Sequence, residues 1–508
     1  MSAARAGRTL RPIDPPIADE RYPQKHTARI RLPGGREAND VRAVATAARG
    51  VWCATGGGLF CVKQTFETEV PLGELPPEWE PPAIAERCEV PLPSDIRDVR
   101  FDERGRLWVA ALDGIACLAA GEWRVVWRDT LDLGFGAVMS LLVEGDEVWA
   151  VTSEGGVGRV REGRFEPLAL PRVIGRPLRL DRAPGGIWIS AARGAALVAP
   201  NGMLRAVGLE GRQVRRALWV GERTYFATDR GLAVHTGEGF AHLPERCPVS
   251  DLHDLAIGPD GTLWAATPRG VWRAPPAGGR VHYYAGRRYV PHPYCRALAP
   301  SPWGMWVGTA AGLAHLAELP MTLAEKAERF ERRVHARHWR LDGYVTSSRL
   351  HRPGDLGSSE PWPSDNDGLW TAMYLAAQAY RWAATGAPEA RRQASRAFSA
   401  LERLESITTV PGFPTKAIVP KGHPEAMHGS VPWYPSADGE WLWKGDCSSD
   451  EIVGHFYGYA LFYDLAASPD ERARVRALVD RIMGHILDHG FFLVGPDGRP
   501  TRWGVWAP

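Results

Sequence analysis

A short phrase that recurs seven times within the first 320 residues restricts the possible folds of this chain more than any other feature. Each copy contains an aromatic residue, a few small or β-branched residues, a polar stretch, a glycine and another apolar residue. The aromatic positions are Trp52, Trp108, Trp149, Trp188, Tyr225, Trp264 and Trp306. After one longer first step they recur at roughly forty residues, a period typical of repeated small β-sheets rather than of a helical solenoid.

A second pattern precedes the aromatic phrase within each unit. The apolar segment 255–257 is followed by Pro259, Asp260 and Gly261, and the apolar pattern then resumes at once. Segment 96–99 is followed in the same way by residues 103–105. Apolar alternation interrupted by Asp-Gly or Arg-Gly is typical of an antiparallel hairpin. Each unit is therefore predicted to be a small antiparallel meander.

Seven such meanders can bury both of their faces only by packing radially around an axis. We therefore predict an all-β, seven-bladed propeller over residues 27–318. The last unit supplies only three strands, so segment 27–32 is predicted to be its outer strand and to close the ring. Residues 1–26 are predicted to be a disordered lead-in, and the Pro-rich segment 71–93 an insert that loops out of the first blade.

The seventh copy, which runs from Met305 to Leu313, resembles the two-component-regulator propeller repeat of sensor proteins and secreted sugar-handling proteins. The resemblance extends over residues 27–318, and the other six copies keep the spacing rather than the wording. It implies a propeller that binds ligands or packs against a partner domain, and it supplies no catalytic residues. The aromatic residues of the phrase are expected to be wedges between blades rather than sugar platforms.

From residue 319 onward the apolar pattern changes to a helical period. Helices are expected at 323–334, 367–385, 388–406, 449–467 and 469–488, with apolar and charged helices alternating. This alternation resembles the α/α toroid of six-hairpin glycosidases, epimerases and some polysaccharide lyases. The segments that carry the resemblance are 364–370 and 444–455. A full toroid needs about twice as many hairpins, so 319–508 is expected to be an all-α, toroid-like domain that is either truncated or a partial ring.

Candidate catalytic side chains gather before two of the expected helices. Glu451 and His455 are one helical turn apart on one face, where they could tune a proton donor. The candidates are Asp365, Asp367, Asp446, Asp450, Glu451 and His455. The alternative is structural, because Asp365 and Asp367 could cap one helix and Ser448 with Glu451 fits a capping box. A buried, hydrogen-bonded role is equally open for His455.

Glycoside hydrolysis needs one neutral and one ionised carboxyl group on either side of the scissile bond, and the two clusters could supply them. The expected substrate-binding residues are Trp362, Trp433, Tyr434, Trp441, Trp443, Arg349 and Lys444. The loop aromatics among them could instead pack against the propeller. A polysaccharide lyase remains an alternative, with a His base, a Tyr acid and a cation for a uronate. Its candidates are His351, His428, His455, Tyr344, Tyr434, Tyr457 and Arg352.

Composition narrows the remaining classes. A net charge near +2 with no basic stripe argues against nucleic acid as a partner. No signal peptide or membrane-spanning run is recognised, so the chain is expected to be cytoplasmic as written, with export possible if the start is misassigned. The seven cysteines show no C-x-x-C pair, and neither a metal nor a cofactor is predicted. We expect a carbohydrate-active enzyme, hydrolase before lyase, or a non-catalytic propeller protein that binds a saccharide or a protein partner.

Overall fold

The computed structural model describes residues 19–47, 50–64, 83–129, 136–145, 147–243, 247–352, 356–427 and 431–507. The chain forms two compact units, and the division falls between Pro320 and Met321. The first unit is built mainly from residues 22–320 and the second mainly from residues 321–508. Each unit has a hydrophobic interior of its own.

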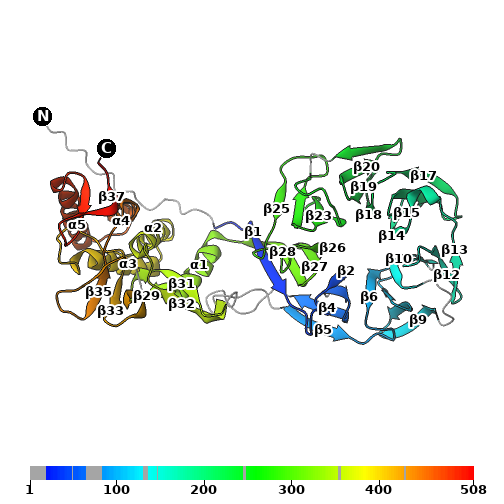
Figure 1. The fold of residues 1–508 in the computed structure, drawn as a ribbon, viewed down its shortest axis with the longest axis horizontal. Coiled ribbons are helices and arrows are strands. Elements are labelled where there is room, and N and C mark those ends of the chain that lie inside the picture. The colour runs from blue at the N-terminus through cyan, green and yellow to red at the C-terminus, as the bar shows by residue number, and fades with distance from the viewer. Residues whose placement is uncertain are drawn as a thin grey trace. The chain divides into compact units, whose positions relative to one another are not determined.

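Within the described ranges, the first unit contains seven four-stranded sheets, which Figure 1 shows arranged in a ring. The first two sheets contain β2 (Val41–Ala47), β3 (Gly50–Thr55), β4 (Gly58–Gln64), β5 (Ala83–Cys88), β6 (Ile96–Phe101), β7 (Leu107–Ala111), β8 (Gly114–Ala119) and β9 (Glu122–Arg128). The next two contain β10 (Val138–Glu144), β11 (Glu147–Thr152), β12 (Val157–Arg161), β13 (Arg164–Pro167), β14 (Pro177–Ala183), β15 (Gly186–Ala191), β16 (Gly194–Val198) and β17 (Leu204–Gly208).

The last three sheets complete the ring. They contain β18 (Val214–Val220), β19 (Arg223–Thr228), β20 (Gly231–His235), β21 (Phe240–Leu243), β22 (Asp254–Ile257), β23 (Leu263–Thr267), β24 (Gly270–Ala274), β25 (His282–Tyr284), β26 (Cys295–Ser301), β27 (Gly304–Thr309), β28 (Gly312–Met321) and β1 (Tyr22–Ile30). The innermost strands β2, β6, β10, β14, β18, β22 and β26 each contact the next around the axis. The predicted seven-bladed propeller is therefore confirmed.

The N-terminal strand closes the ring as expected. β1 is bonded to β28, in the strand order β1-β28-β27-β26. It begins at Tyr22, before the expected boundary at residue 27, so residues 22–26 belong to the strand rather than to a lead-in. Residues 1–18 lie outside the described residues. The expected insert is also shorter than predicted, because Ala83–Cys88 forms β5, and its part from 71 to 82 lies outside the described residues.

The glycine of the repeated phrase is required by the turn between the second and third strands. In the last blade, Gly312 has a φ of +119°, and a Cβ there would lie 2.7 Å from the carbonyl oxygen of Ile30. The hydroxyl of Thr309, at the end of β27, donates to the carbonyl of Gly312 over 2.8 Å. Thr55, Thr228 and Thr267 make the equivalent bond in other blades. The repeated phrase thus forms a hairpin whose turn is stabilised by a hydrogen bond from its own threonine.

The repeated aromatic residues lie between the blades. Trp108 packs with Val138 and Leu141 of the next sheet, and Trp188 packs with Phe226 of the sheet after its own. Six of the seven aromatic side chains are buried and Trp52 is half-buried. Their expected role as wedges is confirmed, and they leave no open platform for a sugar.

Aspartates on the innermost strands tie neighbouring blades together, a feature that the sequence analysis missed. Both carboxylate oxygens of Asp98 accept backbone N–H groups, one from Val99 in its own blade and one from Leu141 in the next, each over 2.9 Å. Asp254 bonds its own and the following blade in the same way. The buried carboxylates thereby satisfy backbone donors that the bulged strands leave unpaired.

In the described part of the second unit there are five α-helices at the expected positions. They are α1 (Leu323–Arg337), α2 (Asp367–Thr385), α3 (Pro388–Ser406), α4 (Ser449–Leu465) and α5 (Pro469–Asp488). The expected all-α description is too simple, because the intervening loops pair as short strands. These are β29 (Trp339–Arg340), β30 (Tyr344–Val345), β31 (Ser347–Leu350), β32 (Ser359–Trp362), β33 (Ile418–Pro420), β34 (Trp433–Pro435), β35 (Trp441–Lys444), β36 (Phe492–Val494) and β37 (Pro500–Val505).

Helices α2 and α4 pack closely because glycines lie at their contact. A Cβ at Gly458 would lie 2.9 Å from the carbonyl oxygen of Ala372, and one at Gly454 would overlap the side chain of Leu369. At the start of α2, Asn366 Nδ2 lies 3.4 Å from a carboxylate oxygen of Asp450, at the start of α4. The two helices are therefore neighbours with their N-termini together, which brings the two predicted acidic clusters to one end of the pair.

Candidate functional site

Asp367, in the first turn of α2, is fully buried and surrounded by donors. One carboxylate oxygen accepts from the hydroxyl of Thr346 over 2.6 Å and from the backbone and hydroxyl of Ser364 over 2.9 and 2.8 Å. The other lies 2.9 Å from an Nη of Arg340. Burial raises the pKa of Asp367, and these partners oppose the rise. The side chain anchors the start of α2, which favours the structural alternative, and its catalytic role stays a prediction.

Glu451 is also fully buried, at the contact between α4 and α2. One carboxylate oxygen accepts the backbone N–H of Leu369 over 3.0 Å, and the other has no partner among the described residues. Burial raises the pKa of this carboxyl group well above its usual range, which favours its neutral form. The predicted capping box is wrong, because the side chain of Ser448 makes no capping bond.

His455 lies one turn along α4 from Glu451 and is equally buried. Its Nδ1 is hydrogen-bonded to the hydroxyl of Tyr459 over 2.7 Å, and its Nε2 lies 3.9 Å from Glu451. Burial lowers the pKa of His455 to about 3, which leaves the ring neutral. A Cβ at Gly368 would overlap Glu451 and His455, so only glycine allows the first turn of α2 to cover them.

Asp365 is one of two predicted carboxylates that stay open to solvent. Its Oδ1 lies 2.8 Å from Nζ of Lys444, which is itself almost buried. Partial burial acts to raise the pKa of Asp365, but the hydrogen bond and charge of Lys444, together with Lys416, outweigh it and lower the pKa. Lys444 also lies 3.7 Å from Glu425, so a cation here holds two carboxylates at the surface.

Asp450 and Asp446 have different surroundings. Asp450 is exposed and lies beside Asn366, so it shares the end of the α2–α4 pair with Asp365. Asp446 has a left-handed backbone, with a φ of +56°, and accepts the backbone N–H of Arg502 over 2.7 Å. That bond ties Asp446 to β37, so the structure brings Asp365 and Asp450 to one open surface and gives Asp446 a loop contact instead.

Most of the predicted sugar platforms are covered by other side chains. Trp443 is fully buried and donates to the carbonyl of Pro435 over 3.2 Å, so it belongs to the core. Tyr434 packs on Trp443, with ring centroids 4.7 Å apart. The remaining rings lie under cations or an imidazole, namely Trp362 under Arg349 and His423, Trp441 under Arg403, and Trp433 under Lys444. These contacts favour a packing role within the unit, and the binding role of the loop aromatics stays a prediction.

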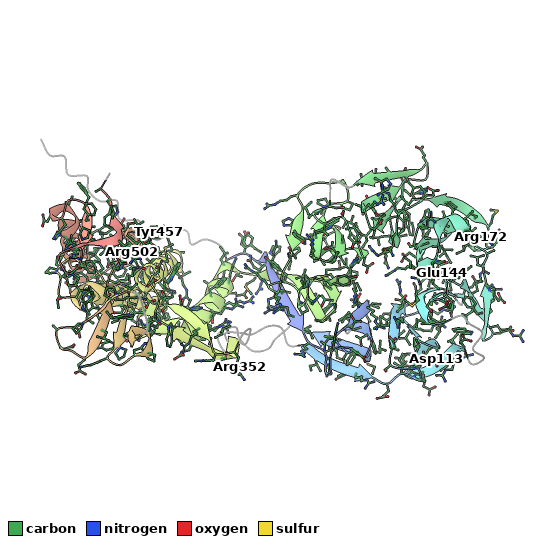
Figure 2. The ribbon with its side chains drawn as sticks, viewed as in Figure 1. Asp113, Glu144, Arg172, Arg352, Tyr457 and Arg502 are labelled. Atoms are coloured by element: carbon green, nitrogen blue, oxygen red, sulfur yellow. The ribbon has the colours of Figure 1, made fainter. Side chains whose placement is uncertain are left out.

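Exposed apolar side chains form outward stripes on α2 and α4, and of these the sequence analysis named only Tyr457, as a lyase candidate. On α2 the outward stripe contains Trp370, Met373 and Tyr380, with exposed fractions of 44%, 49% and 50%. On α4 it contains Val453 and Tyr457, with exposed fractions of 60% and 44%, and Figure 2 labels Tyr457 on this helix. The Tyr380 and Tyr457 hydroxyls are hydrogen-bonded, so the two stripes meet. The sequence feature that indicates these exposed residues is an apolar pattern around the whole circumference of both helices.

The lyase candidates are scattered. His351 pairs with Glu360 over 2.9 Å, and Tyr344 is buried. His428 lies outside the described residues. In the part of the chain that the structure describes, no group of three or more His, Cys, Asp and Glu side chains is placed to hold a metal ion. No described helix is both long and apolar enough to cross a membrane.

Comparison with known proteins finds similar solved structures but no matching family. No family model and no curated protein matches the chain. Virginiamycin B lyase from Staphylococcus aureus is similar at 11% identity and a TM-score of 0.46, over 59% of this chain and 100% of that one. The extracellular domain of a putative hybrid two-component system from B. thetaiotaomicron is similar at 14% identity and a TM-score of 0.44, over 68% of this chain and 46% of that one.

The WD40 propeller domain of Doa1 is similar at 13% identity and a TM-score of 0.42, over 57% of this chain and 95% of that one. This chain spans less than half of the two-component-system domain that it matches. Likenesses of this degree carry no argument about this chain. The class that the sheet order defines is a seven-bladed β-propeller joined to a helical unit.

Proposed function

We propose that the protein binds saccharide chains through the exposed surface of α2 and α4. This surface, the inner-helix face, consists of Trp370, Met373, Tyr380, Val453, Tyr457, Asp365, Asn366 and Asp450. The observation that carries the proposal is a continuous aromatic and apolar surface that ends at two open carboxylates and an amide. Aromatic rings offer flat apolar area for the faces of a pyranose, and carboxylates accept hydrogen bonds from its hydroxyl groups.

Both helices are apolar around their circumference, which is unusual for helices with one side open to solvent. The outer helices differ, because α3 and α5 expose charged side chains such as Arg392 and Asp470. Exposed apolar patches with a polar rim mark binding surfaces. The alternation of apolar and charged helices is that of an α/α toroid, and this resemblance forms part of the proposal.

Glycoside hydrolysis is a second candidate, favoured by one specific observation. The pKa of Asp365 is lowered and that of Glu451 is raised. The positive charge of Lys416 acts to lower the pKa of both carboxyl groups. One ionised and one protonated carboxyl group is the combination that glycosidases use. Glu451 lies under Gly368, so it could protonate a leaving group only after the first turn of α2 moves.

Binding and turnover can be measured together on neutral and uronic-acid oligosaccharides. We expect the intact protein to bind at least one of them in calorimetry, and Trp370→Ala with Tyr457→Ala to weaken binding by about tenfold or more, because a stacked ring contributes about 1 kcal/mol or more. Trp503→Ala is the matched control, because Trp503 is an equally exposed ring on β37 of the same unit. Equal binding by the double variant and the control would refute the proposed surface.

Hydrolysis has its own readout. Release of reducing ends that stops in Asp365→Asn and in Glu451→Gln, while binding persists, would establish the second candidate. Absorbance from an unsaturated uronate would instead indicate the lyase. Binding without either product would leave saccharide recognition as the function of this surface.

A further inference from the structure

Arginines are concentrated at one end of the central channel of the propeller. Six innermost strands in the described part of the ring have an irregular register near their first residues. The residues at these bulges are Arg42, Arg97, Met139, Leu178, Arg215 and Arg296. A bulge redirects a side chain away from its regular position. Four of the six redirected side chains are guanidinium groups at equivalent positions in their blades.

Carboxylates in the preceding loops hold these arginines in place. Arg42 pairs with both Asp40 and Asp95, Arg296 pairs with Asp40, and Arg97 pairs with Asp95 over 2.5 Å. Three guanidinium groups thus share two carboxylates, which leaves an excess positive charge. Because each arginine is bonded on one side, its fork is already oriented before any ligand arrives.

The fourth arginine is held separately. Arg215 lies 2.5 Å from Asp251 and also donates to the backbone carbonyl of Leu252 over 2.9 Å and to the side chain of Gln213 over 2.6 Å. Its geometry is fixed by three acceptors on one side of the guanidinium. Arg215 is therefore fixed by acceptors from its own and the following blade, as Arg42, Arg97 and Arg296 are fixed by aspartates.

A cavity of about 280 Å³ lies at this end of the channel. Its wall contains four guanidinium groups, from Arg42, Arg97, Arg179 and Arg215, and one carboxylate, from Asp98. The carboxylates that hold the bulge arginines are not part of the wall. Arg179 is likewise paired, at 3.3 Å from Asp181 and 3.9 Å from Asp254, so the wall presents more guanidinium groups than carboxylates although each arginine has a carboxylate partner behind it.

The carboxylate of Asp98 is already engaged. It accepts two backbone N–H groups and lies 3.1 Å from Nε of Arg100. By contrast, Nε of Arg97 is buried and has no hydrogen-bond partner among the described residues.

We propose that this cavity binds a small anion that carries two or more carboxylate or phosphoryl groups. Oriented guanidinium forks pair with both kinds of oxyanion in the same geometry. The cavity is near the lower end of the size range of small-molecule sites, which suits a compact ligand. Ser140 and Gln213, which also line it, can donate to a hydroxyl or to further oxygen atoms. The site is separate from the inner-helix face and does not depend on its function.

The test is calorimetric titration of the intact chain with citrate, pyrophosphate and acetate at low and high salt. We expect citrate, pyrophosphate or both to bind, acetate to bind far more weakly, and affinity to fall with salt. Met139→Glu adds a negative charge at the edge of the cavity, because Met139 lines the cavity and its side chain is partly exposed. It should weaken binding by about tenfold or more through repulsion.

Met203→Glu is the matched control, because Met203 is exposed at the outer hairpin before β17 and does not line the cavity. Its affinity should equal that of the unchanged chain. Binding of citrate alone would specify a polycarboxylate and binding of pyrophosphate alone a phosphoryl ligand. Absence of binding by both, or equal weakening in the two Met variants, would overturn the proposal.

Discussion

Glu451 and His455 lie one turn apart on α4 and are both fully buried, and burial favours the neutral form of each. Removing a charged group from water without a full set of partners costs more than giving up or retaining a proton. The pKa of Glu451 therefore rises and that of His455 falls. The free energy of unfolding should therefore depend on pH through these two side chains, which lie at the contact between the two apolar helices.

The sign of that dependence follows from linkage. Glu451 has a raised pKa in the folded chain, so its stabilisation is complete below its usual value of 4.5 and is lost as the pH rises through the raised value. His455 has a lowered pKa, so its stabilisation is complete above its usual value of 6.5 and is lost as the pH falls toward about 3.

Glu451→Gln should remove the loss of stability at high pH. Wild-type stability should fall relative to this variant as the pH rises from about 5 to 9, by up to about 1.4 kcal/mol per pH unit above the unfolded pKa. Thermal unfolding of the intact chain across this range measures the difference. Glu440→Gln, at an exposed turn of the same unit, should show no such trend. Parallel pH profiles for the wild type and Glu451→Gln would contradict the protonated state.

Part of the candidate site followed directly from the sequence. The segments 364–370 and 444–455 mark the starts of α2 and α4, so Asp365, Asp367, Asp450 and Glu451 were predicted at helix N-termini. Which of these carboxylates is buried could not be predicted. It depends on Arg340 of β29 and on backbone donors far away in the sequence. Local patterns give the position of a side chain along a helix but not what covers it.

At the level of elements, propeller strands and helices were predictable because their periodicity is local. The repeated phrase contains both strands of a hairpin and the glycine of its turn, and the helical stretches carry apolar residues at the helical period. The short strands β29–β37 were missed. Segments of so few residues acquire their pairing from tertiary contacts, such as Tyr434 with Trp443, rather than from their own pattern.

Gly312→Ala tests whether the repeated glycine is a structural requirement of the hairpin. A Cβ at this φ is strained and would meet the carbonyl of Ile30 on the closing strand. We expect a loss of more than about 2 kcal/mol in stability, because left-handed backbone alone costs an alanine about 1–2 kcal/mol. Chemical denaturation monitored by tryptophan fluorescence measures it. Gly239→Ala, with open space around the new Cβ and no strained φ, should be nearly neutral.

At the scale of the propeller as a whole, stability depends on completing the ring. Residues 295–321 supply three strands of the last blade, β26, β27 and β28. The outer edge of β28 pairs with β1, so a segment from the start of the chain completes this sheet. Closing a ring with strands from both ends removes an exposed sheet edge. It also means that the other blades cannot be fully stabilised until the ends of the propeller sequence meet.

A chain that begins at Leu32 should therefore retain six complete blades and a seventh blade of three strands, without the strand that closes the ring. We expect a lower unfolding midpoint, by several degrees or more, and increased self-association, because β28 would present unpaired N–H and C=O groups. A synthetic peptide with the sequence of Tyr22–Ile30, added in excess, should restore the midpoint by pairing with that edge. A scrambled peptide of the same composition is the control. An unchanged midpoint in the shortened chain would show that the ring is held by contacts between blades alone.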